Sequence, residues 1–362
     1  MYRCAVIGAA GFTGMELVRL LLTHPQFVLE RISSDSEVGK TLAEVNPFFA
    51  GRTELSFVEH ANILKCSAAQ IDFAFLAVPH TAAMDLAGTL LAKGISVIDL
   101  SADFRLQQPA DYRAWYGSVH SAPELLAKAV YGLPEVYRSQ LKHLAVCRAS
   151  GEAVLVANPG CYPTATTLAA LPILAAGWHK PEAVVVVNAI SGVTGAGKKP
   201  SDITHYCLAN ENLNAYGVTT HRHTPEICQT FAHVAAEKVA VQFTPHLAPL
   251  NRGMVSTVAI ALSPAAAEQA TAESIQALYE QRYAEEPFVQ VLPAGQMPKS
   301  SSVKYSNNAQ VGVVYDASTQ MVVASCAIDN LGKGASAQAV QNANLIFSLK
   351  EICGLSNEGG LL

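Results

Sequence analysis

A cysteine at a strand-to-helix junction is the residue of this sequence best suited to nucleophilic chemistry. Cys161 stands in Asn158-Pro159-Gly160-Cys161-Tyr162-Pro163-Thr164, between an apolar strand expected over 154–157 and an apolar, Ala- and Leu-rich helix. The backbone N–H groups of a helix start favour the thiolate, which is the nucleophilic form of cysteine. None of the other seven cysteines has such a setting, and we expect those to be small buried hydrophobes.

A histidine cluster offers the matching acid or base. In His221-Arg222-His223-Thr224-Pro225-Glu226 the two histidines are two residues apart. A zinc site would call for an H-E-x-x-H spacing or a cysteine pair, so we expect no metal. A solvated loop before a helix over 225–238 is the plain alternative, with Glu226 as a first-turn acid. We favour an acid/base histidine that meets Cys161 across a domain boundary.

A glycine turn near the start of the chain indicates a nucleotide cofactor. Gly8-x-x-Gly11-x-x-Gly14 follows a strand expected over 3–7, and a helix over 15–23 and a strand over 27–32 come next. This order is typical of a dinucleotide-binding unit, in which bare backbone lets a pyrophosphate approach a helix start. Packing of a tight turn is the alternative. The predicted cofactor contacts of this turn are Gly8, Ala10, Gly11, Phe12, Thr13 and Gly14.

The end of the second strand bears on which nicotinamide cofactor binds. Residues 31–36 read Arg-Ile-Ser-Ser-Asp-Ser, with serine where an acid would bind a free ribose 2′-hydroxyl. Ser33 and Ser34 can donate to a 2′-phosphate, which favours NADP, whereas Asp35 keeps NAD open. Pro79, after a strand over 72–78, is expected to lie along the cofactor.

A second glycine-rich loop, Ser191 to Lys199, ends in two lysines. Backbone donors beside cations are common anion sites, so we expect Ser191, Gly192 and Gly195 to face the cofactor. A flexible surface loop is the alternative.

An aspartate and an arginine follow the strand expected over 95–100, at the edge where ligands gather in open parallel sheets. Asp103 and Arg105 could pair with each other. Alternatively, Arg105 binds a carboxylate or phosphate of a ligand through its planar guanidinium group.

The elements that must position these residues change in character near residue 157. Before it, five buried strands predict a doubly wound parallel sheet, that is, a Rossmann α/β domain over 1–157. These strands are expected at 3–7, 27–32, 72–78, 95–100 and 154–157. After it, six strands and one helix predict an α+β domain on a largely antiparallel sheet over 158–329. The strands are expected at 183–189, 238–245, 254–262, 288–292, 310–315 and 321–329, and the helix over 265–284. A helix over 335–350, within the last segment 330–362, could return to the first domain.

Composition excludes several classes of protein. The 362 residues exceed the size of one core, which makes two domains the natural expectation. With 15% charged residues and a net charge of −5, there is no basic field for a nucleic acid. No apolar stretch is long enough for a membrane helix, there is no room for a signal peptide, and the cysteines show no paired framework. We therefore expect a cytoplasmic protein.

Taken together, these motifs resemble the N-acetyl-γ-glutamyl-phosphate reductase family of the semialdehyde dehydrogenase superfamily. The Asn-Pro-Gly-Cys-Tyr-Pro-Thr and His-Arg-His-Thr-Pro-Glu segments are the specific ones. The resemblance covers essentially the whole chain, in the order 8–14, 101–105, 158–164, 191–197, 221–226, 249–253 and 330–335.

The resemblance implies a Rossmann domain, an α+β catalytic and dimerisation domain, and NADPH-dependent reduction of an acyl phosphate to an aldehyde in arginine biosynthesis. It implies Cys161 as nucleophile, forming a thioester, and His221 as acid/base, in a homodimer or homotetramer. Asn330 joins the expected cofactor contacts. The expected substrate contacts are Arg105, Asn158, His223 and Glu226.

Three alternatives stay open. A related reductase of aspartyl phosphate or of a carrier-bound aminoadipyl phosphate needs the same cysteine and histidine with a different pocket. A non-catalytic nucleotide-binding sensor would keep the glycine turn without turnover. A thiol hydrolase also uses Cys and His, but it leaves the two glycine-rich loops unexplained.

Overall fold

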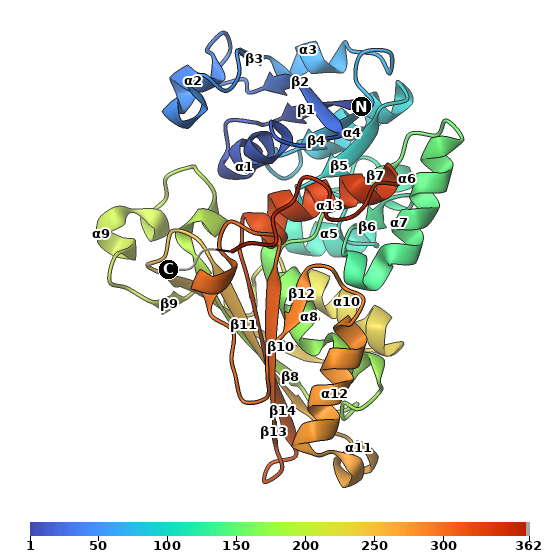
Figure 1. The fold of residues 1–362 in the computed structure, drawn as a ribbon, viewed down its shortest axis with the longest axis vertical. Coiled ribbons are helices and arrows are strands. Elements are labelled where there is room, and N and C mark those ends of the chain that lie inside the picture. Colours follow the sequence, from blue (N-terminus) through green and yellow to red (C-terminus); the bar gives the residue numbers. More distant parts are fainter. Residues whose placement is uncertain (360–362) are drawn as a thin grey trace. The chain divides into compact units, whose positions relative to one another are not determined.

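The computed structural model describes residues 1–359, so the last three residues of the segment 330–362 lie outside the described residues. The chain forms two compact units (Figure 1). The first comprises Met1–Pro159 and Ala335–Leu355, and the second comprises Gly160–Gly334 with residues 356–359. No helix among residues 1–359 is both long enough and apolar enough to cross a membrane.

The first unit contains a parallel sheet with the strand order β3-β2-β1-β4-β5-β7-β6. All six neighbouring pairs run parallel, which matches the predicted doubly wound arrangement. The strands are β1 (Tyr2–Ile7), β2 (Phe27–Ser33), β3 (Phe57–Val58), β4 (Phe73–Leu76), β5 (Ser96–Asp99), β6 (Val130–Tyr131) and β7 (Leu155–Ala157). The helices are α1 (Phe12–Leu21), α2 (Leu42–Val45), α3 (His60–Leu64), α4 (Ala83–Ala92), α5 (Pro109–Tyr116), α6 (Pro123–Leu126), α7 (Pro134–Ala149) and α13 (Ala337–Ile346).

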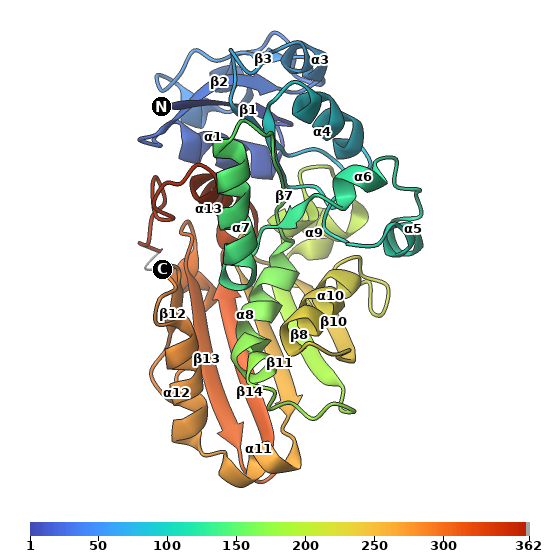
Figure 2. The ribbon, with the colours of Figure 1, turned by 90° about the vertical axis from the view of Figure 1, so that its right-hand side faces the viewer.

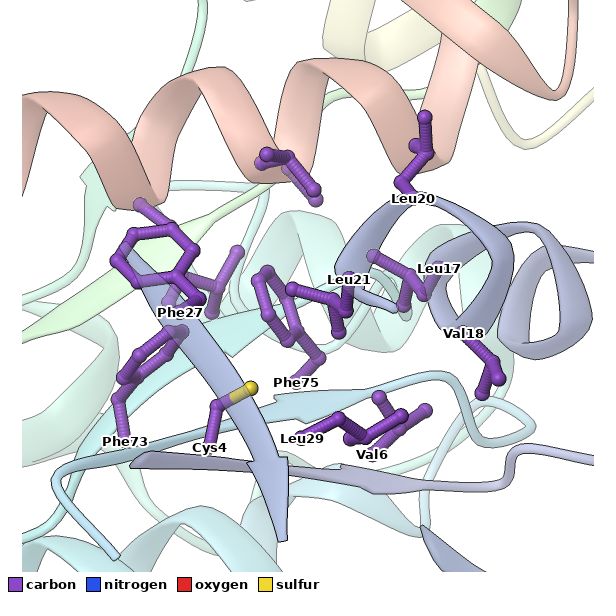
Figure 3. Close-up of a cluster of buried hydrophobic side chains, with 14 of the residues drawn as sticks. Cys4, Val6, Leu17, Val18, Leu20, Leu21, Phe27, Leu29, Phe73 and Phe75 are labelled. Carbon is purple, nitrogen blue, oxygen red and sulfur yellow. The ribbon is translucent and has the colours of Figure 1, made fainter. Parts of the chain in front are cut away.

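A hydrophobic core joins the first strands of this sheet to α1 and to the C-terminal helix α13 (Figure 3). The ring of Phe73 lies 4.9 Å from that of Phe27 and 4.6 Å from that of Phe347, which follows α13. Phe347 is 2% exposed, and burying a side chain of this size contributes about 1.5–3 kcal/mol. The last helix is therefore a structural part of the first unit.

The second unit is built on a mixed sheet with the order β12-β13-β14-β11-β8-β10-β9. Four of its six pairs are antiparallel, and β8–β10 and β12–β13 are parallel. The strands are β8 (Val185–Gly192), β9 (Asn214–Ala215), β10 (Val241–Ala248), β11 (Met254–Ala261), β12 (Val289–Val291), β13 (Ala309–Asp316) and β14 (Met321–Ile328). The helices are α8 (Cys161–Ala175), α9 (Tyr206–Ala209), α10 (Thr224–Ala235), α11 (Pro264–Gln269) and α12 (Ala272–Tyr283).

One face of this sheet is covered by helices, as Figures 1 and 2 show from two directions. Along β11, Met254, Ser256, Val258 and Ile260 are buried, whereas the alternate residues are partly exposed. This alternation follows from the twofold side-chain period of a strand. The other face therefore stays partly accessible in this chain.

One expectation about helices was wrong. The single helix expected over 265–284 is divided into α11 and α12, because Ala270 is extended and Thr271 caps a new helix by accepting from the Ser274 N–H at 3.1 Å.

Candidate active site

Cys161 is the first residue of α8 and is half-buried. Gly160 is the N-cap residue with extended backbone, and no side chain of its own caps the helix. Pro163 has no N–H, and the Thr164 N–H donates to the Gly160 carbonyl at 3.1 Å. The amides of Cys161 and Tyr162 thus occupy the positions whose N–H groups a helix does not use internally. This arrangement stabilises negative charge on the thiol and on a substrate oxygen beside it.

Aromatic rings connect the thiol to the histidine cluster. The Tyr162 ring lies 5.4 Å from the His221 ring and 5.9 Å from the His223 ring, centroid to centroid. Tyr216 lies 5.4 Å from His221, and its hydroxyl donates to the Tyr162 hydroxyl at 3.1 Å. Burial raises the pKa of Tyr216 to about 12, and the nearby Cys161 contributes in the same direction. Cys161 and His221 therefore share one site within the second unit.

The protonation state of His221 is set by its surroundings. Burial, assisted by the positive charge of Arg222, lowers its pKa to about 4, so the imidazole is neutral at pH 7. Its Nδ1 accepts a hydrogen bond from the His223 backbone N–H at 3.1 Å. The proton of the neutral ring must then be on Nε2. His221 accordingly presents a hydrogen-bond donor to the site.

Glu226 lies in the first turn of α10 and is 1% exposed. Its Oε1 accepts a hydrogen bond from the Gly160 N–H at 2.8 Å. Glu226 therefore contacts the chain immediately before Cys161, and its contact with substrate stays a prediction. His223 is partly exposed and stays beside Tyr162.

Two other predicted substrate residues hold the chain of the first unit together. Arg105 is 8% exposed, and its guanidinium donates to the carbonyls of Asn158 and Leu100, both at 2.8 Å. Asn158 has no exposed surface, donates to the Ala335 carbonyl at 3.1 Å, and accepts from Asn342 at 2.9 Å. These contacts fix the segment that precedes Pro159. Asn158 is thus buried within this network, and its contact with substrate stays a prediction.

Asp103 binds the start of α4. Its carboxylate accepts hydrogen bonds from the Thr81 and Ala83 N–H groups at 2.8 and 2.9 Å, and from the Tyr112 hydroxyl at 2.7 Å. Thr81 has a φ of 73°, a left-handed conformation that is unfavourable for a β-branched residue. Asp103 therefore stabilises the strained turn just after the exposed Pro79.

A second buried carboxyl, Asp99, should make stability depend on pH. Burial and the neighbouring Asp103 raise its pKa to about 7. Between its ordinary pKa near 3.8 and this value, the unfolded chain loses a proton that the folded protein keeps, so stability falls as pH rises through that window. Asp99→Asn cannot ionise. We expect its melting temperature, relative to the parent, to increase between pH 5 and pH 8; an unchanged difference in calorimetry would contradict this.

The glycine turn of the first unit has the form that a dinucleotide requires. A Cβ on Gly8 would lie 2.3 Å from the Ala77 carbonyl oxygen, and one on Gly14 would lie 2.4 Å from the Gly8 carbonyl oxygen. At Gly11, the N-cap of α1, the nearest such contact is an ordinary 3.7 Å. Gly8 and Gly14 thus allow tight packing, and Gly11 leaves space at the helix start for a pyrophosphate. Ala10, Phe12 and Thr13 flank this space in sequence.

The two serines at the end of β2 differ in access. Ser33 has no exposed surface, and its hydroxyl lies 2.8 Å from Nδ1 of His60. Ser34 is 6% exposed, with its hydroxyl 3.1 Å from that of the exposed Ser36. Asp35 accepts from the His60 N–H at 2.9 Å. The Ser33 hydroxyl is thus buried against His60, and its contact with a 2′-phosphate stays a prediction.

The predicted cofactor residues of the second unit are packed closely together. They are Ser191, Gly192, Gly195 and Asn330. A Cβ on Gly192 would lie 2.7 Å from the Leu250 carbonyl oxygen, and one on Gly195 would lie 3.0 Å from the Ser191 hydroxyl. Asn330 accepts from the Gly253 N–H at 2.7 Å and donates to the Thr194 hydroxyl at 2.9 Å. The loop 191–197 is therefore a shaped element anchored by Asn330.

Sequence reasoning missed the glycine that packs against Cys161. A Cβ on Gly334 would lie 2.7 Å from Cβ of Cys161. The turn that carries Gly334 is organised by Asp329, which is fully buried and accepts from Arg252 Nε at 2.9 Å and from the Leu331 N–H at 2.9 Å. The Gly-Lys-Gly run at 332–334 was the available signal.

Comparisons with known proteins agree with this architecture. Residues 3–144 match the family described as semialdehyde dehydrogenase, NAD binding domain, and residues 161–330 match semialdehyde dehydrogenase, dimerisation domain. An N-acetyl-gamma-glutamyl-phosphate reductase from Pseudomonas savastanoi pv. phaseolicola is 44% identical over 359 residues, which cover 99% of each chain. The chain belongs to the N-acetyl-γ-glutamyl-phosphate reductase family. A member from Desulfotalea psychrophila is 43% identical over 362 residues, 100% of this chain and 98% of that one.

Solved structures of more distant proteins share the fold. Aspartate semialdehyde dehydrogenase II from Vibrio cholerae aligns with a TM-score of 0.68 at 18% identity, over 96% of this chain and 99% of that chain. The aspartate semialdehyde dehydrogenase of Candida albicans with NADP aligns with a TM-score of 0.69 at 12% identity, over 96% and 98%. At these identities the likeness establishes the fold alone. The predicted Rossmann fold with a second α+β domain is confirmed.

Proposed function

We propose that this chain reduces N-acetyl-glutamyl 5-phosphate to N-acetyl-glutamate 5-semialdehyde and phosphate, with NADPH, in arginine biosynthesis. The observation that carries the proposal is Cys161 at the start of α8 in one site with His221, within a chain 44% identical to a reductase of that name over 99% of its length.

The chemistry begins at the thiol. The Cys161 thiolate attacks the acyl carbonyl, the new C–S bond replaces the C–O bond to phosphate, and a thioester remains. The phosphate takes up the one proton that the overall reaction consumes. Bound NADPH supplies the hydride that reduces the thioester carbonyl. The resulting thiohemiacetal oxyanion then breaks its C–S bond, which releases the aldehyde and returns the thiolate.

The chain's own donors stabilise these intermediates. The amides of Cys161 and Tyr162 lie at the helix start, where negative charge is favoured. His221 donates from Nε2 to the substrate oxygen as it gains charge. Arg105 remains our candidate for binding a negative group of the substrate, and His223 remains a candidate substrate contact.

The finer choice of NADP over NAD is also a proposal. The exposed Ser36 follows the end of β2, with its hydroxyl 3.1 Å from that of the buried Ser34, while Asp35 accepts a hydrogen bond from the start of α3. Hydroxyls donate to a 2′-phosphate, and a carboxylate would repel it. We assign the 2′-phosphate to Ser34 and Ser36 in place of Ser33.

A substrate comparison tests the function. The assay runs the reaction in reverse and monitors the absorbance of NADPH. We expect phosphate-dependent reduction of NADP⁺ by N-acetyl-glutamate semialdehyde, and little reaction with aspartate semialdehyde at equal concentration. Preference for aspartate semialdehyde would assign the chain to the related reductases. Cofactor binding without phosphate-dependent turnover would instead indicate a nucleotide sensor.

We further propose a cytoplasmic homo-oligomer that associates through the less covered face of the second sheet. On that face Ile190, Asn188 and Val186 of β8 stand opposite Val255, Thr257 and Ala259 of β11, and all are partly or fully exposed. None of the eight cysteines, all within the described residues, forms a disulfide, which suits a reducing compartment. Light scattering should show a dimer or tetramer that Val255→Asp weakens; a monomeric parent would refute this.

A further inference from the structure

The start of the nucleophile's helix is capped by a carboxylate from another helix. Gly160, the N-cap of α8, carries no side chain, and its N–H donates to Glu226 Oε1 at 2.8 Å. Glu226 lies 66 residues after Gly160 in the sequence and reaches it from the first turn of α10. A buried N–H is costly to leave without an acceptor. Glu226 thus determines the orientation of the peptide group directly before Cys161.

The position of Glu226 itself is restrained. Its side chain is 1% exposed, and its backbone carbonyl accepts the Thr230 hydroxyl at 3.0 Å. Ile227 and Phe231 of the same helix have no exposed surface. The carboxylate is therefore held on a well-packed helix and shielded from solvent.

Its electrostatic effect is opposite to that of the helix start. The helix N-terminus favours a thiolate at Cys161, whereas a carboxylate on the preceding amide disfavours negative charge nearby. A substrate-binding role would not require a contact with Gly160. A positioning role explains why a carboxylate occurs where it works against the thiolate, because the geometry it provides outweighs its charge.

We propose that Glu226 is a positioning residue that holds the Gly160 peptide, and through it the Cys161 thiol, in the geometry for attack. This inference rests on the proposed role of Cys161 as nucleophile. It assigns Glu226 to the nucleophile and not to the substrate. Attack geometry is demanding, since a displacement of about 1 Å can cost on the order of 100-fold in rate.

Two substitutions separate geometry from charge. Glu226→Gln keeps an oxygen that can accept from Gly160 and removes the charge; Glu226→Ala removes both. For Ala we expect kcat to fall on the order of 100-fold while KM for the semialdehyde stays within about twofold. For Gln we expect kcat within about fivefold of the parent. Glu268→Gln, an exposed acid on α11, is the matched control and should change neither constant.

Thiol reactivity gives a readout without substrate. The rate of Cys161 alkylation by iodoacetamide, against pH and with Cys161→Ser as the blank, should shift to lower pH in Glu226→Gln because a negative charge has been removed. A purely structural role would leave that profile unchanged. If the Ala variant does not fold, the Gln profile still decides the matter.

The outcomes are distinct. A raised KM with unchanged kcat in either variant would place Glu226 against the substrate and overturn the proposal. An unchanged alkylation profile in Gln, or an unchanged kcat in Ala, would also overturn it. If instead Cys161→Ser retained turnover, the proposed function would fail, whereas the effect of Glu226 on alkylation would still be measurable.

Discussion

Cys161→Ser is expected to lose turnover by at least about 10³-fold, as removal of a covalent nucleophile does, while NADPH affinity changes by less than about twofold because the thiol contributes chemistry and not cofactor binding. A serine hydroxyl is not ionised near neutral pH, even at a helix start, and attacks an acyl phosphate far more slowly than a thiolate. Steady-state turnover together with fluorescence titration of NADPH measures both quantities.

A matched cysteine controls for non-specific effects of the substitution. Cys207→Ser alters an exposed cysteine of the same unit, on α9, and should keep parental activity. A Cys161→Ser protein that retained a tenth of the activity would refute the nucleophilic role.

His221→Asn is expected to lower kcat by about 10²–10⁴-fold, the range for removal of an acid/base group. The asparagine oxygen can replace Nδ1 as acceptor for the His223 N–H, so the local backbone is preserved, but the donor at Nε2 is lost. His221→Gln places an amide N–H near the position of Nε2 and should recover part of the rate. Rapid-mixing kinetics with each variant measures the loss in the chemical step.

The pH profile tests the assigned protonation state. Because burial lowers the pKa of His221 to about 4, the parent should show no loss of kcat from this group as pH falls from 8 to 6. Between its ordinary pKa near 6.5 and 4, the unfolded chain binds a proton that the folded protein does not, so stability falls with falling pH. The His221→Asn protein should lack this part of the loss of stability at low pH. A His223→Asn protein with the larger loss of kcat would exchange the two roles.

The main elements of both units were predictable because their residues carry a long or strongly apolar signal. Strands such as β1, β11 and β14 contain enough apolar residues to be recognised alone. The two-residue strands β3, β6 and β9 are too short to show any period, and pairing with neighbours decides them. The break between α11 and α12 was signalled by Thr271 and Ser274, yet the surrounding alanines favoured a continuous helix.

The candidate site divides in the same way. Cys161 and Gly8 to Gly14 could be assigned from local order alone, since a strand, a turn and a helix start create their chemistry wherever they occur. The surroundings of Ser33 and Glu226 could not be assigned in this way, because the sequence does not show whether a polar side chain is buried or exposed. The partner of Glu226 is 66 residues away in the sequence, and only packing of α10 on α8 brings them together.

By itself the sequence determined which reactive groups exist and which local backbone each one has, because short-range sterics and hydrogen bonds decide strands, turns and helix starts. Only the tertiary structure decided which groups are accessible and in which protonation state. The low pKa of His221, the buried hydroxyl of Ser33 and the contact of Gly334 with Cys161 depend on desolvation and close approach by segments distant in sequence, which no local pattern encodes.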